Sequence, residues 1–509
     1  MADVHARSRL LPMGLSRWTA AACVLTAALG PPDGAAGRLE EGLEAMRAGR
    51  FEEAELHFAR LSKESPSAPE GPFFQAFEIW WKLLDRGRER PGMRDAMEER
   101  LAEAAARARL LRGSSDPSER ERGSTFFGIA RLLDAQSKAS RGAHMAASSS
   151  ARQGHRALSE AIEAHPSASD ALFAMGAYNY YADKLPAVVK GLRFVLFIPG
   201  GDSDLGLRQL EQAADSSALF GTEALMLLAH IHSTAEPSDH RRAVGYIRRA
   251  ARRQPLSPIV ALGLADLLHD MGQLRASRRT AEEVAGSLHG ASGYRRDLAR
   301  YAEYRLAASL LESHDPLAAL RRIEQAMDTL CPEISTERRR WMSLLSAAAA
   351  QSGKPERISL WVDRLAPGPK EAAAAERRAE AARRDNLAPG RALALAEAAA
   401  GRLDEALRRL HALREHDPLD TRLRYDLGRL LQEKGAFDQA RPHLEAAAQG
   451  KDPELAGWAL LRLGWEKERD GQRAQALPYY RKAAGMRRFN FQAAARDRLL
   501  HPRDDQPEG

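Results

Sequence analysis

Histidine and cysteine are the residue types through which this sequence could most readily carry chemistry. His230 and His232 lie two residues apart, and on a helix such residues point about 200° from each other, so they cannot chelate one metal ion. His411 and His416, five residues apart, are also a poor pair of ligands. Cys331 has no histidine nearby in sequence, which favours a buried thiol over a nucleophile. We therefore expect no metal, no cofactor and no catalytic residue here.

Motifs of the common enzyme classes are missing from the chain. It contains no Gly-x-Ser-x-Gly elbow, no His-Glu-x-x-His zinc motif, no P-loop and no Gly-x-Gly-x-x-Gly fingerprint. A catalytic group assembled from distant residues remains an alternative. The place to look for it, or for a ligand site between helices, is residues 176–206, where a tyrosine cluster, an apolar run and a Gly-rich turn interrupt the pattern.

This interruption has three readings. We favour a packed insertion, placed at residues 186–204. A surface helix that contacts a membrane or a partner would bring Lys184, Lys190 and Arg193 near lipid headgroups, over residues 184–198. Its apolar run is shorter than the roughly 20 residues that span a bilayer. A phosphate-binding loop is the least favoured, because Asp202 and Asp204 would stand where the anion should lie.

Opposite charges nearly balance along the 509 residues. There are 76 basic and 69 acidic residues, for a net charge of +7, and only 6% of the residues are aromatic. A nucleic-acid surface needs clustered charge with interleaved aromatic residues. We therefore expect no nucleic-acid partner, and a basic nucleic-acid binder remains an alternative.

The first 30 residues have the pattern of an export signal. Arg7, Arg9 and Arg17 precede an apolar stretch over residues 18–29, and small residues follow. This stretch is too short for a membrane span but typical of a signal peptide. We predict a signal peptide or N-terminal anchor at residues 1–30, and hence a bacterial protein that is periplasmic or held at the envelope. The alternative location is cytoplasmic.

Helical spacing dominates the rest of the chain, and near its end the pattern repeats. Gly401, Gly435 and Gly471 recur at intervals of 34 and 36 residues. An alanine follows each glycine after five residues, at Ala406, Ala440 and Ala476. Gly428 and Gly464 lie in the helix before the turn. We expect the turn glycines to adopt the positive φ that ends a helix, and the small helical residues to let two helices approach closely.

These residues resemble the tetratricopeptide repeat family, whose unit is a 34-residue helix-turn-helix, over residues 388–484. One repeat near the N-terminus also fits the resemblance. Its residues are Gly42, Gly49, Phe51, Ala54, Phe58 and Pro66. Units in the middle are degenerate. The resemblance implies an all-α fold, a right-handed superhelical solenoid of stacked helix-turn-helix repeats.

The predicted organisation has six parts. They are a signal peptide or anchor at 1–30, helical repeats at 38–185, the insertion at 186–204, degenerate repeats at 205–370, tetratricopeptide repeats at 388–490 and a polar tail at 491–509.

The resemblance also implies a concave groove lined by the first helix of each repeat. The side chains that it places in the groove are Arg391, Arg422, Tyr425, Arg429, Trp458 and Trp465. If exposed, they would suit an extended peptide with acidic or aromatic side chains; the alternative for Trp458 and Trp465 is packing between repeats. We expect a non-enzymatic scaffold or adaptor that binds a protein or peptide in this groove.

Overall fold

The computed structural model describes residues 35–84, 92–184, 200–235, 238–330, 335–365, 368–486 and 491–501. These residues form 24 helices and no strand. They divide into two compact units. The C-terminal unit takes the described residues within 236–244 and 261–509, and the N-terminal unit takes those within 13–235 and 245–260. The predicted signal peptide, Cys331 and most of the 186–204 insertion lie outside the described residues.

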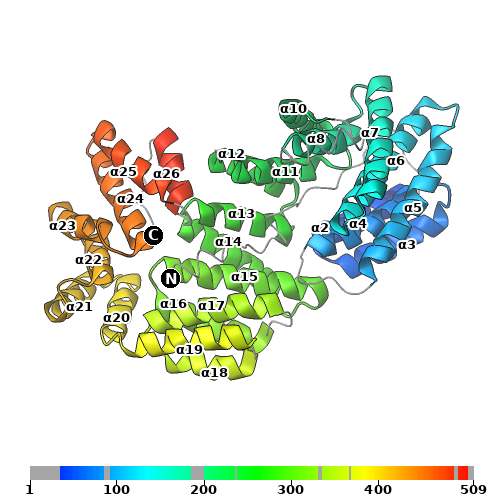
Figure 1. The fold of residues 1–509 in the computed structure, drawn as a ribbon. Helices are drawn as coiled ribbons and strands as arrows, with labels where there is room; N and C mark the ends of the chain where they lie inside the picture. The colour runs from blue at the N-terminus through cyan, green and yellow to red at the C-terminus, as the bar shows by residue number, and fades with distance from the viewer. Residues whose placement is uncertain are drawn as a thin grey trace. The chain divides into compact units, whose positions relative to one another are not determined.

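The N-terminal unit is built from consecutive antiparallel helices that pack against one another (Figure 1). Its helices are α2 (Ala35–Arg47), α3 (Phe51–Glu64), α4 (Glu70–Leu84), α5 (Met93–Arg112), α6 (Pro117–Ser140), α7 (His144–Ala164), α8 (Ser169–Asp183), α10 (Ser203–Ser216) and α11 (Gly221–Thr234). Two further helices, α12 (His240–Arg253) and α13 (Pro258–Asp270), contribute residues to both units.

The C-terminal unit continues the same arrangement. Its helices are α14 (Leu274–Ser287), α15 (Gly293–Glu312), α16 (Pro316–Leu330), α17 (Ser335–Gln351), α18 (Glu356–Leu365), α19 (Pro369–Arg383), α20 (Ala388–Ala399), α21 (Leu403–His416), α22 (Thr421–Glu433), α23 (Phe437–Ala448), α24 (Pro453–Arg469), α25 (Arg473–Gly485) and α26 (Phe491–Leu500). The predicted fold class, all-α with stacked helix-turn-helix repeats, is confirmed.

Turns within the helix pairs follow one hydrogen-bonding pattern. At Gly435 the backbone has φ 84°. The Gly435 amide donates to the Gln432 carbonyl at 2.9 Å, and the Ala436 amide donates to the Leu431 carbonyl at 2.8 Å. This is the closure that a left-handed residue gives to a helix C-terminus. Positive φ also occurs at Gly49, Gly272, Gly353, Gly401 and Gly471.

Small residues set the distance between paired helices, as predicted. A Cβ atom at Gly428 would lie 2.7 Å from Leu444 Cγ, and one at Gly464 would lie 2.5 Å from Tyr480 Cε1. Ala440 and Ala476 are fully buried. In the pair α13–α14, Ser277 takes the alanine position, and its hydroxyl donates to the Ala265 carbonyl at 2.7 Å.

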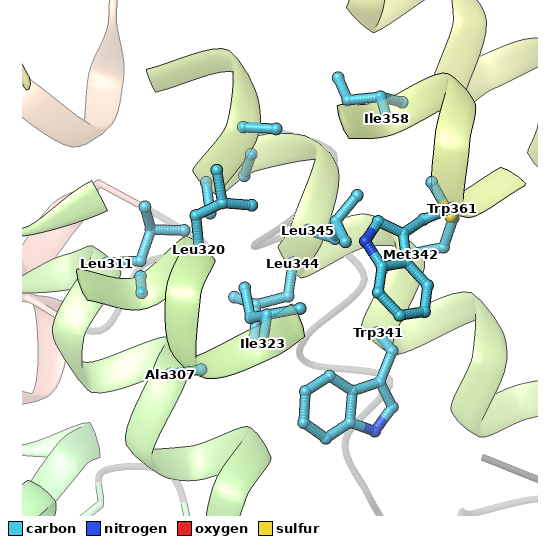
Figure 2. Packing of buried hydrophobic residues seen from close by; sticks show 14 of the residues in the cluster. Ala307, Leu311, Leu320, Ile323, Trp341, Met342, Leu344, Leu345, Ile358 and Trp361 are labelled. Atoms are coloured by element: carbon cyan, nitrogen blue, oxygen red, sulfur yellow. The ribbon is translucent and has the colours of Figure 1, made fainter. Parts of the chain in front are cut away.

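Each unit has its own apolar core. In the C-terminal unit, Figure 2 shows Leu345 of α17 between Leu320 of α16 and Trp361 of α18, all of them buried. In the N-terminal unit, Phe73 of α4 meets Phe126 of α6 edge-on at 5.2 Å between ring centroids. None of the described helices combines the length and apolarity that a membrane crossing requires.

The end of the chain differs from the predicted polar tail. Residues 491–500 form α26, and Phe491 is fully buried. Its ring fills the space over Gly457, where a Cβ atom would lie 2.1 Å from Phe491 Cζ. The sequence analysis missed this helix because it follows the last recognisable repeat and has no repeat signature of its own.

Candidate partner-binding site

Most of the residues predicted to line an open groove are buried. Their fractional exposures are 5% for Arg391, 0% for Tyr425, 6% for Arg429, 4% for Trp458 and 7% for Trp465. They lie on the first helices of their repeats, α20, α22 and α24, as the resemblance implied. These five side chains therefore do not line an open groove, because other helices of the same unit cover this face of α20, α22 and α24, which we call the inner face.

Arg391 of α20 is held by two carboxylates. Its guanidinium donates to Asp385 Oδ2 at 2.6 Å and to Asp420 Oδ2 at 2.9 Å. Asp420 also caps α22, because its other oxygen accepts from the Leu423 amide at 2.8 Å. Arg391 therefore joins the start of α20 to the start of α22, which is a structural role.

Tyr425 of α22 packs against a residue from an earlier repeat. Its ring centroid lies 5.2 Å from that of His314, in the turn between α15 and α16. Its hydroxyl accepts from Arg462 Nε at 3.1 Å. Tyr425 is thus enclosed on both sides and does not face an open groove.

Asp426 and Arg429 are neighbours of Tyr425 on α22. Arg429 Nη1 donates to Glu433 Oε1 at 2.7 Å. Asp426 is 1% exposed, and both of its carboxylate oxygens are buried without a hydrogen-bond partner. Burial raises the pKa of Asp426, and the positive charges of Arg429 and Arg422 offset part of this rise. The sequence analysis did not single out this aspartate.

The two tryptophans of α24 pack between elements, which was the alternative reading. Trp458 meets Phe491 at 6.0 Å between centroids. It also reaches the turn after α13, where a Cβ at Gly272 would lie 2.9 Å from its ring. Trp465 meets Phe437 of the preceding repeat at 5.9 Å.

Arg422 is the one predicted groove residue that keeps a partly exposed side chain, at 18%. Its Nη1 donates to Gln351 Oε1 of α17 at 3.4 Å, and its Nη2 lies 3.5 Å from Asp452 Oδ2. Arg422 lines two neighbouring cavities. The first, which we call the inner cavity, has a volume of about 40 Å³. The second, the arginine pocket, has a volume of about 250 Å³.

The arginine pocket lies among α17, α19, α20 and α22. Its polar lining carries three guanidinium groups and one carboxylate. These polar residues are Ser346, Gln351, Arg378, Asp385, Arg391 and Arg422. Such a lining suits an acidic group, because guanidinium pairs with carboxylate in a bidentate geometry. The sequence analysis missed Arg378, since it lies on α19, outside the recognisable repeats.

In the described part of residues 176–206, the helices α8 and α10 pack closely against each other. Gly176 of α8 faces Gly206 of α10, and a Cβ at Gly176 would lie 2.9 Å from the Gly206 carbonyl oxygen. Beside them, Asn179 Nδ2 donates to Gln209 Oε1 at 2.8 Å. Two helices in this contact leave no room for a ligand between them, which argues against a catalytic site there. Residues 185–199, including Lys190 and Arg193, lie outside the described part.

The histidines of the sequence analysis have ordinary surroundings. The His232 ring stacks on Tyr246 at 5.5 Å, and the His411 ring lies 6.4 Å from that of His443 in the next repeat. Among the residues that the structure describes, no three His, Cys, Asp or Glu side chains are grouped to hold a metal ion.

Comparison with known proteins gives one sequence match and several distant structural likenesses. The profile described as "Tetratricopeptide repeat" matches residues 397–463. No curated protein matches the sequence.

Three solved structures illustrate the likenesses. The tetratricopeptide repeat domain of P58(IPK) is 15% identical, with 79% of this chain and 99% of that chain covered and a TM-score of 0.21. Yeast Tom70 is 10% identical, with 92% and 99% covered and a TM-score of 0.31. Human IFIT1, solved as a dimer with m7Gppp-AAAA, is 11% identical, with 88% and 94% covered and a TM-score of 0.29. These TM-scores are low, so the likenesses carry no argument about a ligand or a partner.

Over its described residues, the chain is all-helical and is built from stacked helix pairs. Residues 397–463, from the end of α20 into α24, are tetratricopeptide repeats, as the spacing of Gly401, Gly435 and Ala440 predicted.

Proposed function

We propose that this chain is a non-enzymatic scaffold that binds a protein partner of the bacterial envelope or periplasm, and that it holds an acidic side chain of that partner in the arginine pocket. Tetratricopeptide repeats generally serve as scaffolds for protein–protein interaction. The observation that carries the proposal is the pocket lining, which holds the guanidinium groups of Arg378, Arg391 and Arg422 and the carboxylate of Asp385. The export part of the proposal rests on the N-terminal sequence pattern.

The pocket can take a side chain but not a folded element. Its volume is about 250 Å³, which is small beside the pockets of roughly 300–1,000 Å³ that hold drug-sized ligands. Arg391 is already held by Asp385 and Asp420. Arg391 is buried, whereas Arg378 and Arg422 are both partly exposed, so we assign these two arginines to the partner's carboxylate.

The test is capture of a partner from envelope extract with the full-length chain. Arg378→Gln combined with Arg422→Gln should reduce recovery of a discrete, saturable partner at least tenfold, on the order of the 1.4 kcal/mol that a charged contact contributes. A matched control is Arg402→Gln with Arg408→Gln, which removes the same charge from two exposed arginines. Equal recovery by both double variants would overturn the pocket assignment, and the absence of any saturable partner would overturn the scaffold itself.

The cellular compartment of the protein is tested by a separate experiment. Sequencing the N-terminus of the protein recovered from fractionated cells should show a chain that starts between residues 31 and 37 in the periplasmic or membrane fraction. An intact Met1 in the cytoplasmic fraction would contradict export.

A further inference from the structure

One turn of the C-terminal unit has a histidine where its sister turns have glycine. The turn between α15 and α16 is closed like the others, since the His314 amide donates to the Leu311 carbonyl at 3.1 Å and the Asp315 amide donates to the Leu310 carbonyl at 2.9 Å. His314 has φ 60° and is the only non-glycine residue with positive φ in the described part of the chain. A left-handed conformation is unfavourable for an ordinary residue, because its Cβ atom then lies too close to the following carbonyl oxygen. Strain of this kind persists only where surrounding contacts fix it.

Those contacts come from the inner face of α22. The side chain of His314 is 9% exposed, with its ring against Tyr425 and its Nδ1 atom 3.9 Å from Asp426 Oδ1. That distance is too long for a hydrogen bond. His314 Nε2 and both carboxylate oxygens of Asp426 are buried without a hydrogen-bond partner. The strained turn thus holds two polar groups in contact but unsatisfied, which is an unfavourable arrangement for a purely structural contact.

Cations surround this contact. Burial, followed by the charges of Arg429, Arg422 and Arg462, lowers the pKa of His314 well below its ordinary value of 6.5. The imidazole is therefore neutral in the closed turn, and its approach to Asp426 is not an ion pair. A proton on His314 would add a further cation to this group. The inner cavity, which His314 lines, has a volume of about 40 Å³, enough for one or two waters beside the ring.

We propose that the turn between α15 and α16 is an acid-released latch over the inner face of α22, closed while His314 is neutral and opened when it takes up a proton. Opening uncovers Tyr425, Asp426 and Arg422. Because Arg422 lines both the inner cavity and the arginine pocket, opening of the latch would alter the part of the partner site that Arg422 forms. The effect of the latch on the partner site rests on the proposed function, whereas the opening of the turn does not.

The sign of the pH dependence follows from the charges that face the ring. These are Arg422, Asp426 and Arg429 on α22, Arg462 on α24, and Glu312 and Glu454, which line the inner cavity together with His314. His269 of α13 lies 3.1 Å from Glu312. In an open turn His314 returns to its ordinary pKa, so the open form binds one more proton below pH 6.5. Between pH 7.5 and pH 5.5 the titration of His314 by itself should therefore raise the opening equilibrium about tenfold.

The titration of Asp426 acts against that of His314. Because the pKa of Asp426 is raised in the closed turn, a proton on its carboxyl group favours closure. Asp426→Asn removes this opposing titration. The variant should show an acid-driven opening at least as large as that of the wild type.

The experiment is hydrogen exchange on the full chain at pH 7.5 and 5.5, corrected for intrinsic exchange rates, with no partner present. Amides of residues 310–318 and 422–430 should lose up to about tenfold in protection at the lower pH, while amides of α3 in the N-terminal unit keep theirs. His314→Gly suits the turn and should abolish the effect. His314→Asn should also abolish the effect, because asparagine tolerates this conformation. This second variant shows that the loss does not come from the flexibility of glycine.

His289→Gln, at an exposed histidine of the same unit, is the matched control and should keep the effect. An unchanged protection in the wild type, or the same acid loss in His314→Gly, would overturn the latch. Because no partner is used, this failure would be distinct from a failure of the scaffold proposal.

Discussion

At the residue scale, the glycines inside helices are the most direct test of how this chain packs. Gly428→Ala should lower the free energy of unfolding by about 1–3 kcal/mol, because overpacking forces neighbours from their places. The new Cβ would lie 2.7 Å from Leu444 Cγ and 3.2 Å from the Leu444 amide nitrogen. Urea unfolding followed by circular dichroism measures the change.

Gly286→Ala in the same unit is the control for that substitution. Gly286 is exposed near the end of α14, and a Cβ there meets nothing within 4 Å. Alanine should leave stability unchanged or raise it by up to about 1 kcal/mol, because it has the higher helix propensity. Equal losses in the two variants would mean that close helix approach does not explain Gly428.

The same scale shows what could be predicted from the sequence. Turn glycines and buried alanines were recognisable because backbone conformation and contact distance permit few residue types there. His314 was not predicted, because its residue type differs from the glycine of the other turns. A signal was present, since the turn residue precedes the small buried residue by five positions in Gly401–Ala406, Gly435–Ala440 and Gly471–Ala476. The same offset from Ala319 leads back to His314.

At the element scale, α26 is the part of the fold that had no repeat signal. Phe491→Ala should destabilise the C-terminal unit by about 3–5 kcal/mol, the loss typical of removing a buried phenylalanine. Phe491 is fully buried, and its ring packs on Gly457 and Trp458. A polar tail, by contrast, would tolerate the substitution.

The control lies on the same helix. Leu500 is 67% exposed at the end of α26, so Leu500→Ala should change the free energy of unfolding by less than about 0.5 kcal/mol. Thermal and urea unfolding of both variants would decide between a docked helix and a tail. If Phe491→Ala matched the control, the docking of α26 would be wrong.

At the scale of the molecule, the site diverged from its prediction because burial is a property of the whole unit. The repeat pattern placed Arg391, Tyr425 and Trp458 on first helices, where the structure also has them. It could not show that the turns after α13 and α15 cover this face, since these belong to degenerate repeats whose register the sequence leaves open. Asp426 and Arg378 were missed because their importance comes from contacts with residues that are far away in sequence.

Fragments of the chain test whether the recognisable repeats form a domain of their own. Fragment 256–509 contains nearly all of the C-terminal unit, including the turns that carry Gly272 and His314. Fragment 388–509 retains α20–α26 but loses the turns that carry Gly272 and His314. It should therefore expose Tyr425 and Trp458, unfold at lower urea concentration and bind more of an apolar dye. Equal urea midpoints for the two fragments would show that α13–α17 contribute nothing to the inner face, and the covered groove that underlies both proposals would then be wrong.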